Sequence, residues 1–179
     1  MVVGEASTWL ELDGVRVAVQ FDSAAMQHRR KGGHNEMLGR AVGLKADRKP
    51  LIGDATGGLG RDAFVLADLG CEVTLCERMP VLAWLLYQAV QAAAVSGVDQ
   101  IRAAAARMSV LAVDSKTQRT PAGTVIYLDP MFPERKKAAA VKKEAAMLQH
   151  LADPVDDCET LWQWAWDQPV ERIVVKRPL

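Results

Sequence analysis

The sequence predicts an α/β fold in which a doubly wound, mostly parallel sheet is covered by helices on both faces. Three observations support this class. From residue 50 onward, short runs of strand-forming residues alternate with longer helical stretches. Half of the 179 residues are apolar, which is enough for one domain with a substantial core. No apolar run reaches the roughly 18 residues of a membrane helix.

The individual elements follow in order along the chain. A strand or hairpin is expected first, with Asp13-Gly14 as its turn. The later strands are expected at 50–53, 71–77, 124–129 and 171–178, and the helices at 61–70, 80–97 and 137–150. We place an N-terminal hairpin and basic segment at 1–49 and the α/β domain at 50–179, because no repeat and no strong linker divides the chain further.

Two segments require a decision between competing signals. Alanines in 101–113 favour a helix, but the alternation of elements calls for a strand, so we expect a short strand leading into Met108-Ser109. The segment "LWQWAW" at 161–166 predicts a helix whose inner face carries Leu161, Trp162, Ala165 and Trp166, with Trp164 partly exposed.

Composition narrows the functional classes. Lys+Arg and Asp+Glu both total 22, whereas general polyanion binders are usually basic. The three cysteines lack metal-ligand spacing, and the acidic N-terminus does not resemble a secretory signal. We therefore expect a cytoplasmic protein, monomeric, without a metal and without a membrane anchor.

The stretch "LIGDATGGLGRD" predicts a cofactor-binding turn between a strand and a helix. Its pattern is D-x-x-x-G-x-G, formed by Asp54, Gly58 and Gly60, and it lacks the third glycine of a dinucleotide fingerprint. Glu77 follows 17 residues after Gly60, where an acid can accept hydrogen bonds from ribose hydroxyls. An acid before the turn repels a pyrophosphate and suits a cationic amino-acid end, which indicates S-adenosylmethionine and disfavours a nicotinamide oxidoreductase.

The stretch "YLDPMFP" predicts the reacting end of the site. It ends the fourth strand of the α/β unit, which is expected beside the first. The carboxylate of Asp129 can accept hydrogens of a base amine, the rigid Pro130 limits the backbone, and Phe132 can stack on an unstacked base. Methyltransferases of exocyclic base amines carry a similar Asp/Asn-Pro-Pro-aromatic loop.

Together, "AMQHRRKGG", "DATGGLGRDAFVLADLGCEV", "ERMPV", "YLDPMFPERKKAAAVKKE" and "RIVVKRP" resemble the ribosomal small-subunit RNA methyltransferase J family. The resemblance implies a Rossmann-like class I fold, S-adenosylmethionine as cofactor, and transfer to a guanine N2 amine of 16S rRNA or of the small ribosomal subunit. It implies cofactor contacts at Arg61, Asp62, Glu77, Arg78, Met108, Ser109 and Asp129. Compared with the family, both ends of the chain look shortened, and we expect the last two of seven strands to be missing.

Basic clusters on either side of the cofactor motifs predict RNA contacts. They comprise His28, Arg29, Arg30 and Lys31 before the first strand of the domain, and Lys136 and Lys137 after the Asp129 loop. Two alternatives remain open: a truncated, catalytically silent RNA-binding module, and a methyltransferase that acts on amines of DNA or protein.

Overall fold

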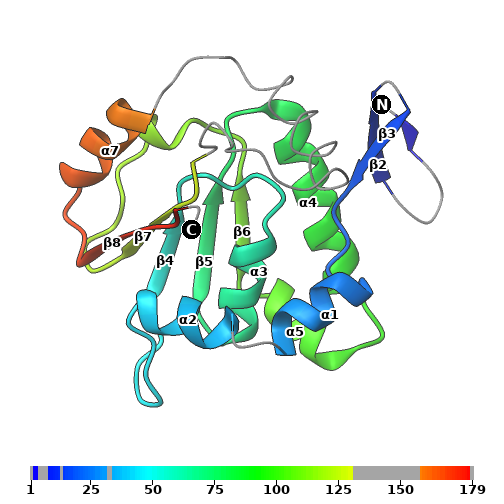
Figure 1. Ribbon diagram of the computed structural model, residues 1–179, viewed down its shortest axis with the longest axis horizontal. Helices are drawn as coiled ribbons and strands as arrows, with labels where there is room; N and C mark the ends of the chain where they lie inside the picture. Colours follow the sequence, from blue (N-terminus) through cyan, green and yellow to red (C-terminus); the bar gives the residue numbers. More distant parts are fainter. Residues whose placement is uncertain (1, 4–7, 13, 32–33, 131–157, 178–179) are drawn as a thin grey trace.

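The computed structural model describes residues 2–3, 8–12, 14–31, 34–130 and 158–177. Its centre is a five-stranded sheet of order β6-β5-β4-β7-β8 (Figure 1). The strands are β4 (Leu51–Asp54), β5 (Glu72–Cys76), β6 (Met108–Leu111), β7 (Val125–Leu128) and β8 (Arg172–Val175). All four pairings are parallel, and β7 lies beside β4 as the sequence predicts.

Side chains alternate between the two faces of β7 and join separate cores. Val125 and Tyr127 pack into the large core formed with α3 (Arg61–Asp68), α4 (Pro80–Ala94) and α5 (Asp99–Ala105). Ile126 and Leu128 pack on the opposite face, against α7 (Cys158–Trp166). This alternation is the period of two that a strand imposes, and it confirms a sheet covered on both faces. No helix in the described part of the chain is long and apolar enough to cross a membrane.

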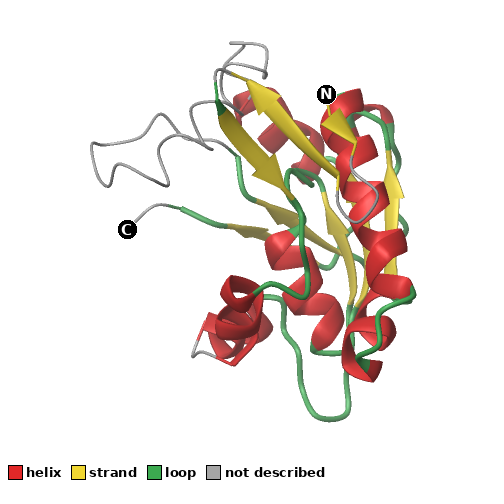
Figure 2. Cartoon of the chain, turned by 90° about the vertical axis from the view of Figure 1, so that its right-hand side faces the viewer, coloured by secondary structure: helices red, strands yellow, loops and turns green. Residues whose placement is uncertain are grey.

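The N-terminal strands form a second, antiparallel sheet on the outer side of α4 (Figure 1). It consists of β1 (Val2–Val3), β2 (Thr8–Leu12) and β3 (Val15–Ala18), and the β2–β3 pair confirms the expected hairpin. Leu10 and Val17 of this hairpin pack on Leu82 and Leu85 of α4. The hairpin is seen from its outer side in Figure 2.

Two short helices, α1 (Ala24–Lys31) and α2 (His34–Ala41), connect the hairpin to the main sheet. Phe21 and Met26 are buried in the same core as Phe64 of α3, and the Phe21 and Phe64 rings stack with centroids 4.3 Å apart. The core therefore crosses the boundary that we place between residues 49 and 50.

The expected strand at 101–113 is partly wrong. Residues 99–105 form α5, and β6 begins only at Met108. Ile101, Ala104 and Ala105 are buried at helical spacing, so packing reinforces the helix preference of the alanines.

The expected inner face of α7 is also wrong for two tryptophans. Trp162 and Trp166 are 44% and 68% exposed and lie against each other, with ring centroids 6.1 Å apart. Ala165 is buried, and Trp164 packs beside it while its indole N–H donates to the Gln118 carbonyl at 3.1 Å. With Trp164 and Ala165 on the inner side of α7, the rings of Trp162 and Trp166 face outward.

Candidate cofactor and substrate site

Charged side chains follow four strands at one edge of the main sheet. Asp54 ends β4, and Glu77, Asp129 and Lys176 come directly after β5, β7 and β8. Since these strands are parallel and adjacent, their carboxyl ends meet at the same edge, which is where α/β sheets bind ligands. The three acids predicted from separate stretches of sequence are thus brought together.

The glycine turn is fixed by Glu77. The carboxylate of Glu77 accepts the N–H of Gly58 at 2.7 Å and the N–H of Met79 at 2.8 Å, which joins the turn to the start of α4. Gly58 and Gly60 have φ angles of 52° and 64°, in the left-handed region that favours glycine. A Cβ at Gly60 would lie 2.5 Å from Leu86, so α4 packs directly against this position.

Asp54 is a buried carboxyl group beneath this turn. It is 3% exposed and accepts the backbone N–H of Thr56 at 3.0 Å. Burial, with a smaller contribution from the charges of Asp62 and Asp129, raises the pKa of Asp54 to about 7. Thr56 also uses its hydroxyl oxygen to accept the N–H of Asp129 at 2.7 Å. Thr56 therefore ties the glycine turn to the start of the Asp129 loop, a link that sequence reasoning missed.

Asp62 is the centre of an ion-pair network. It is 6% exposed, and its carboxylate accepts from Arg29, from the Tyr127 hydroxyl at 2.8 Å and from Lys176 Nζ at 2.8 Å. Burial alone would raise the pKa of Asp62, but Lys176 and Arg29 hold it well below its usual range. Asp62 therefore connects α1, β7 and the residue after β8.

Lys176 joins Asp62 to Asp129. Its ammonium group lies 2.8 Å from Asp62 Oδ2 and 2.6 Å from Asp129 Oδ2. Burial would lower the pKa of Lys176, but hydrogen bonds to the two carboxylates and their charges raise it above its ordinary value. Sequence reasoning did not single out Lys176, although its position directly after a buried strand was a usable signal.

The predicted contacts at Met108 and Ser109 are not supported. These residues begin β6, and Met108 pairs with Val73 near the start of β5, so they lie toward the amino ends of the strands. Asp114 and Ser115, in contrast, follow the carboxyl end of β6. This end lies beside Glu77, whose N–H donates to the Leu111 carbonyl at 3.0 Å. A strand that runs into an acid, as at Asp54 and Asp129, was the signal that could have identified Asp114.

The remaining predicted residues divide into three groups. Arg61 begins α3 and Arg78 follows Glu77, and both are exposed at the ligand edge. Pro130 follows Asp129 and is half-buried. Phe132, Lys136 and Lys137 lie outside the described residues, as does the helix expected at 137–150.

The basic residues of α1 that are predicted to contact RNA differ in their accessibility. His28 and Lys31 are exposed, whereas Arg29 pairs with Asp62. Arg30 forms two hydrogen bonds of 2.9 Å to Asp68 and lies over the Phe64 ring. The Arg30 and Asp68 side chains are only 9% and 8% exposed, so Arg30 serves the packing of α1 on α3 and is not available to phosphates.

The donor set of this edge fits one class of cofactor. Asp54, Glu77 and Asp129 suit hydroxyl groups and a cationic amino-acid end, and they disfavour a phosphate. With the glycine turn and the sheet order, they define a Rossmann-like methyltransferase dependent on S-adenosylmethionine.

Comparisons with known proteins identify the family. Residues 7–179 match a family model described as "Putative SAM-dependent methyltransferase", and the chain belongs to this family. It is 47% identical over 167 residues to the ribosomal RNA small subunit methyltransferase J of Aeromonas salmonicida (strain A449), covering 90% of this chain and 67% of that protein. The protein of the same name from Hydrogenovibrio crunogenus is 46% identical over 168 residues, again covering 90% of this chain but 60% of the relative.

A solved structure shows the same fold. The crystal structure of a SAM-dependent methyltransferase from Neisseria gonorrhoeae matches with a TM-score of 0.73 and 33% identity, covering 97% of this chain and 69% of the other. The chain thus spans between 60% and 69% of the length of these three relatives.

Proposed function

We propose that the protein transfers a methyl group from S-adenosylmethionine to the exocyclic N2 amine of a guanine in small-subunit ribosomal RNA. The observation that carries this proposal is the position of Asp129. Its carboxylate lies at the end of β7, tied to the cofactor turn through Thr56 and to Asp62 through Lys176. The names of the relatives support RNA of the small ribosomal subunit as the substrate. Such a reaction belongs in the cytoplasm, where ribosomes are assembled.

The residues that would hold the cofactor follow the sheet edge. We assign Glu77 to the ribose hydroxyls, because each carboxylate oxygen can accept a second hydrogen bond beyond the one from the backbone. Asp54, Gly58, Gly60 and Arg61 surround the turn and would hold the amino-acid end. Arg78, Asp114 and Ser115 lie beyond Glu77 on the β6 side and are our candidates for the adenine end.

Asp129 would prepare the amine for attack. A base amine is a poor nucleophile, because its lone pair is delocalised into the ring. A carboxylate that accepts its N–H favours a pyramidal nitrogen and directs the lone pair outward. Lys176 occupies Asp129 Oδ2, which leaves Oδ1 for the substrate and fixes the carboxylate plane. We expect Pro130 to restrict the backbone of the loop and the ring of Phe132 to stack on the base.

The cofactor would supply a methyl group on a sulfonium, whose neutral thioether is a good leaving group, so neither a metal nor a covalent enzyme intermediate is required. The proton lost from the amine would pass to Asp129 or to water. The protein contributes position and electrostatics, which supply much of the acceleration in such displacements.

The test measures transfer of labelled methyl from S-adenosylmethionine to small ribosomal subunits that lack the modification, with digestion to identify the nucleoside. Asp129→Asn is expected to reduce transfer at least a hundredfold while cofactor binding is retained. Asp99→Asn, on the exposed start of α5, is the matched control. Unchanged turnover in Asp129→Asn would exclude the proposed role. Label in DNA or protein, but not in RNA, would instead favour the alternative amine substrate, and RNA binding without any cofactor binding would favour the silent module.

A further inference from the structure

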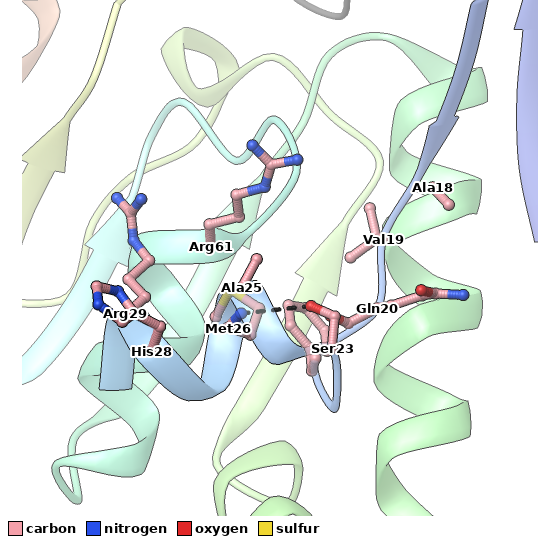
Figure 3. Close-up of a pocket in the computed structure, with 10 residues that line it drawn as sticks. Ala18, Val19, Gln20, Ser23, Ala25, Met26, His28, Arg29 and Arg61 are labelled. Atoms are coloured by element: carbon pink, nitrogen blue, oxygen red, sulfur yellow. Dashed lines mark hydrogen bonds between the residues drawn. The ribbon is translucent and has the colours of Figure 1, made fainter. Parts of the chain in front are cut away.

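A cavity of about 550 Å³ lies between α1, the β3–α1 connection and the start of α3 (Figure 3). Its size falls within the range of about 300–1,000 Å³ that is typical of pockets for small organic groups. Arg61 is the one lining residue that we also assign to the cofactor, since Asp54, Glu77 and Asp129 are not among the lining residues. The cavity therefore adjoins the cofactor site and shares Arg61 with it.

The walls of this cavity differ in chemistry. Arg29, His28 and Arg61 lie on one side, and Val19, Gln20 and Ser23 lie on the other (Figure 3). Val19 and Ala25 contribute apolar surface beside the buried Phe21 and Met26, and none of the described residues that line the cavity carries a carboxylate. Cations on one wall and apolar groups on another suit a ligand that combines an anionic group with a flat ring.

The cationic wall is connected to the reacting end of the site. Arg29 pairs with Asp62, and Asp62 shares Lys176 with Asp129. Arg61 directly follows Gly60 of the cofactor turn. A ligand that contacts Arg29 in the cavity would thus be connected, through Asp62 and Lys176, to the carboxylate of Asp129, to which we assign the target amine.

We propose that this cavity receives a nucleotide of the RNA substrate that neighbours the target base, with its phosphate toward Arg29 and Arg61 and its base against the apolar wall. This proposal rests on the proposed function and deepens it. S-adenosylmethionine also carries an anionic carboxylate, but we place that end of the cofactor at the glycine turn, so we assign the anionic group in the cavity to the other substrate. Because the formal net charge of the chain is zero, local sites of this kind must supply the attraction for RNA.

A cavity-filling substitution tests the proposal. Ala24 and Ala25 are both exposed in the first turn of α1, but only Ala25 lines the cavity. Ala25→Trp is expected to weaken binding of a single-stranded oligoribonucleotide and to raise KM for small ribosomal subunits, each by about tenfold, since a stacked base contributes on that scale. The Kd for S-adenosylmethionine should stay unchanged, and Ala24→Trp should change none of these quantities.

A charge substitution provides an independent measurement in case the tryptophan disturbs α1. His28→Glu introduces a carboxylate at the cationic wall, and Gln27→Glu introduces one on the same exposed helix away from the cavity. We expect only His28→Glu to reduce oligoribonucleotide affinity several-fold, with a smaller salt dependence.

The outcomes separate this proposal from the proposed function. RNA affinity equal in Ala25→Trp and Ala24→Trp, or in His28→Glu and Gln27→Glu, overturns the cavity proposal even if methyl transfer is observed. A selective loss of cofactor affinity in Ala25→Trp also overturns it, because the cavity would then belong to the cofactor. If the variants show that the cavity binds RNA but the wild-type protein transfers no methyl group, the proposed function fails, and the cavity remains an RNA-binding site with no target base beside it.

Discussion

Asp54→Asn should change how the stability of the protein depends on pH. Asp54 is almost fully buried, and burial raises the pKa of its carboxyl group to about 7. The folded protein therefore holds a proton on Asp54 at a pH where the unfolded chain, with an ordinary pKa of 3.8, has lost it. The contribution of this group to stability is fully present at low pH and is lost as the pH rises through about 7.

The size of the effect follows from these two pKa values. Each pKa unit corresponds to about 1.4 kcal/mol, so between about pH 4.5 and pH 7.5 the Asp54 contribution to the free energy of unfolding should fall by about 3 kcal/mol. Asp62 has its pKa lowered, so its contribution is present above the ordinary pKa of 3.8 and is lost as the pH falls through and below that value. The two groups therefore act in separate pH windows.

Urea unfolding at a series of pH values from about 4.5 to 7.5 measures the effect. The wild-type protein should lose stability relative to Asp54→Asn as the pH rises, whereas Asp99→Asn, whose side chain is 92% exposed, should run parallel to the wild type. A constant difference between wild type and Asp54→Asn across this range would show that the carboxyl group is ionised in the folded protein, and the reasoning from burial would be refuted.

Three further changes give distinct results. Lys176→Met should reduce kcat much more than it weakens cofactor binding. It should also lower the free energy of unfolding by only about 1–2 kcal/mol, because Lys176 is 37% exposed. Recovery of kcat by Lys176→Arg would support a role of Lys176 in positioning Asp129, and an unchanged kcat in Lys176→Met would contradict it. Arg30→Met should lower the free energy of unfolding in urea by about 3 kcal/mol, since it leaves Asp68 buried without its bidentate partner, and RNA affinity should not change. Weaker RNA binding at unchanged stability would instead support Arg30 as a phosphate contact. Asp114→Ala should weaken binding of S-adenosylmethionine about tenfold in calorimetric titration, whereas Ser109→Ala should not; the opposite order would reverse our correction at β6.

The main sheet could be predicted because local signals agree with the tertiary structure. Asp54, Glu77 and Asp129 each end a run of strand-forming residues, and parallel strands place such acids on a common edge whatever the details of packing. The segment 101–113 was harder to predict, because it contains both a helix and a four-residue strand. The alternation of elements requires a strand there, but it does not show where the helical signal of "AAAA" ends and the strand begins.

The ion-pair network could not be predicted from sequence. Arg29, Arg30 and Lys176 are ordinary basic residues in the chain, and only the packing of α1 on α3, with β8 beside β7, gives each its carboxylate partner. The tryptophans of α7 show the same limit. Both faces of that helix carry indole rings, so periodicity alone could not choose which face is buried. The buried face includes Trp164, whose hydrogen-bond acceptor lies 46 residues away in sequence.

The network of Arg29, Asp62, Asp129 and Lys176 also has a consequence for biosynthesis. Its members are drawn from nearly the whole length of the chain, from the first helix to the residue after β8. During translation the emerging chain can form the Arg29–Asp62 pair and most of the sheet early, but Asp129 and Asp62 cannot be joined until Lys176 has left the ribosome. This arrangement therefore cannot form before β8 and the residue that follows it have been synthesised.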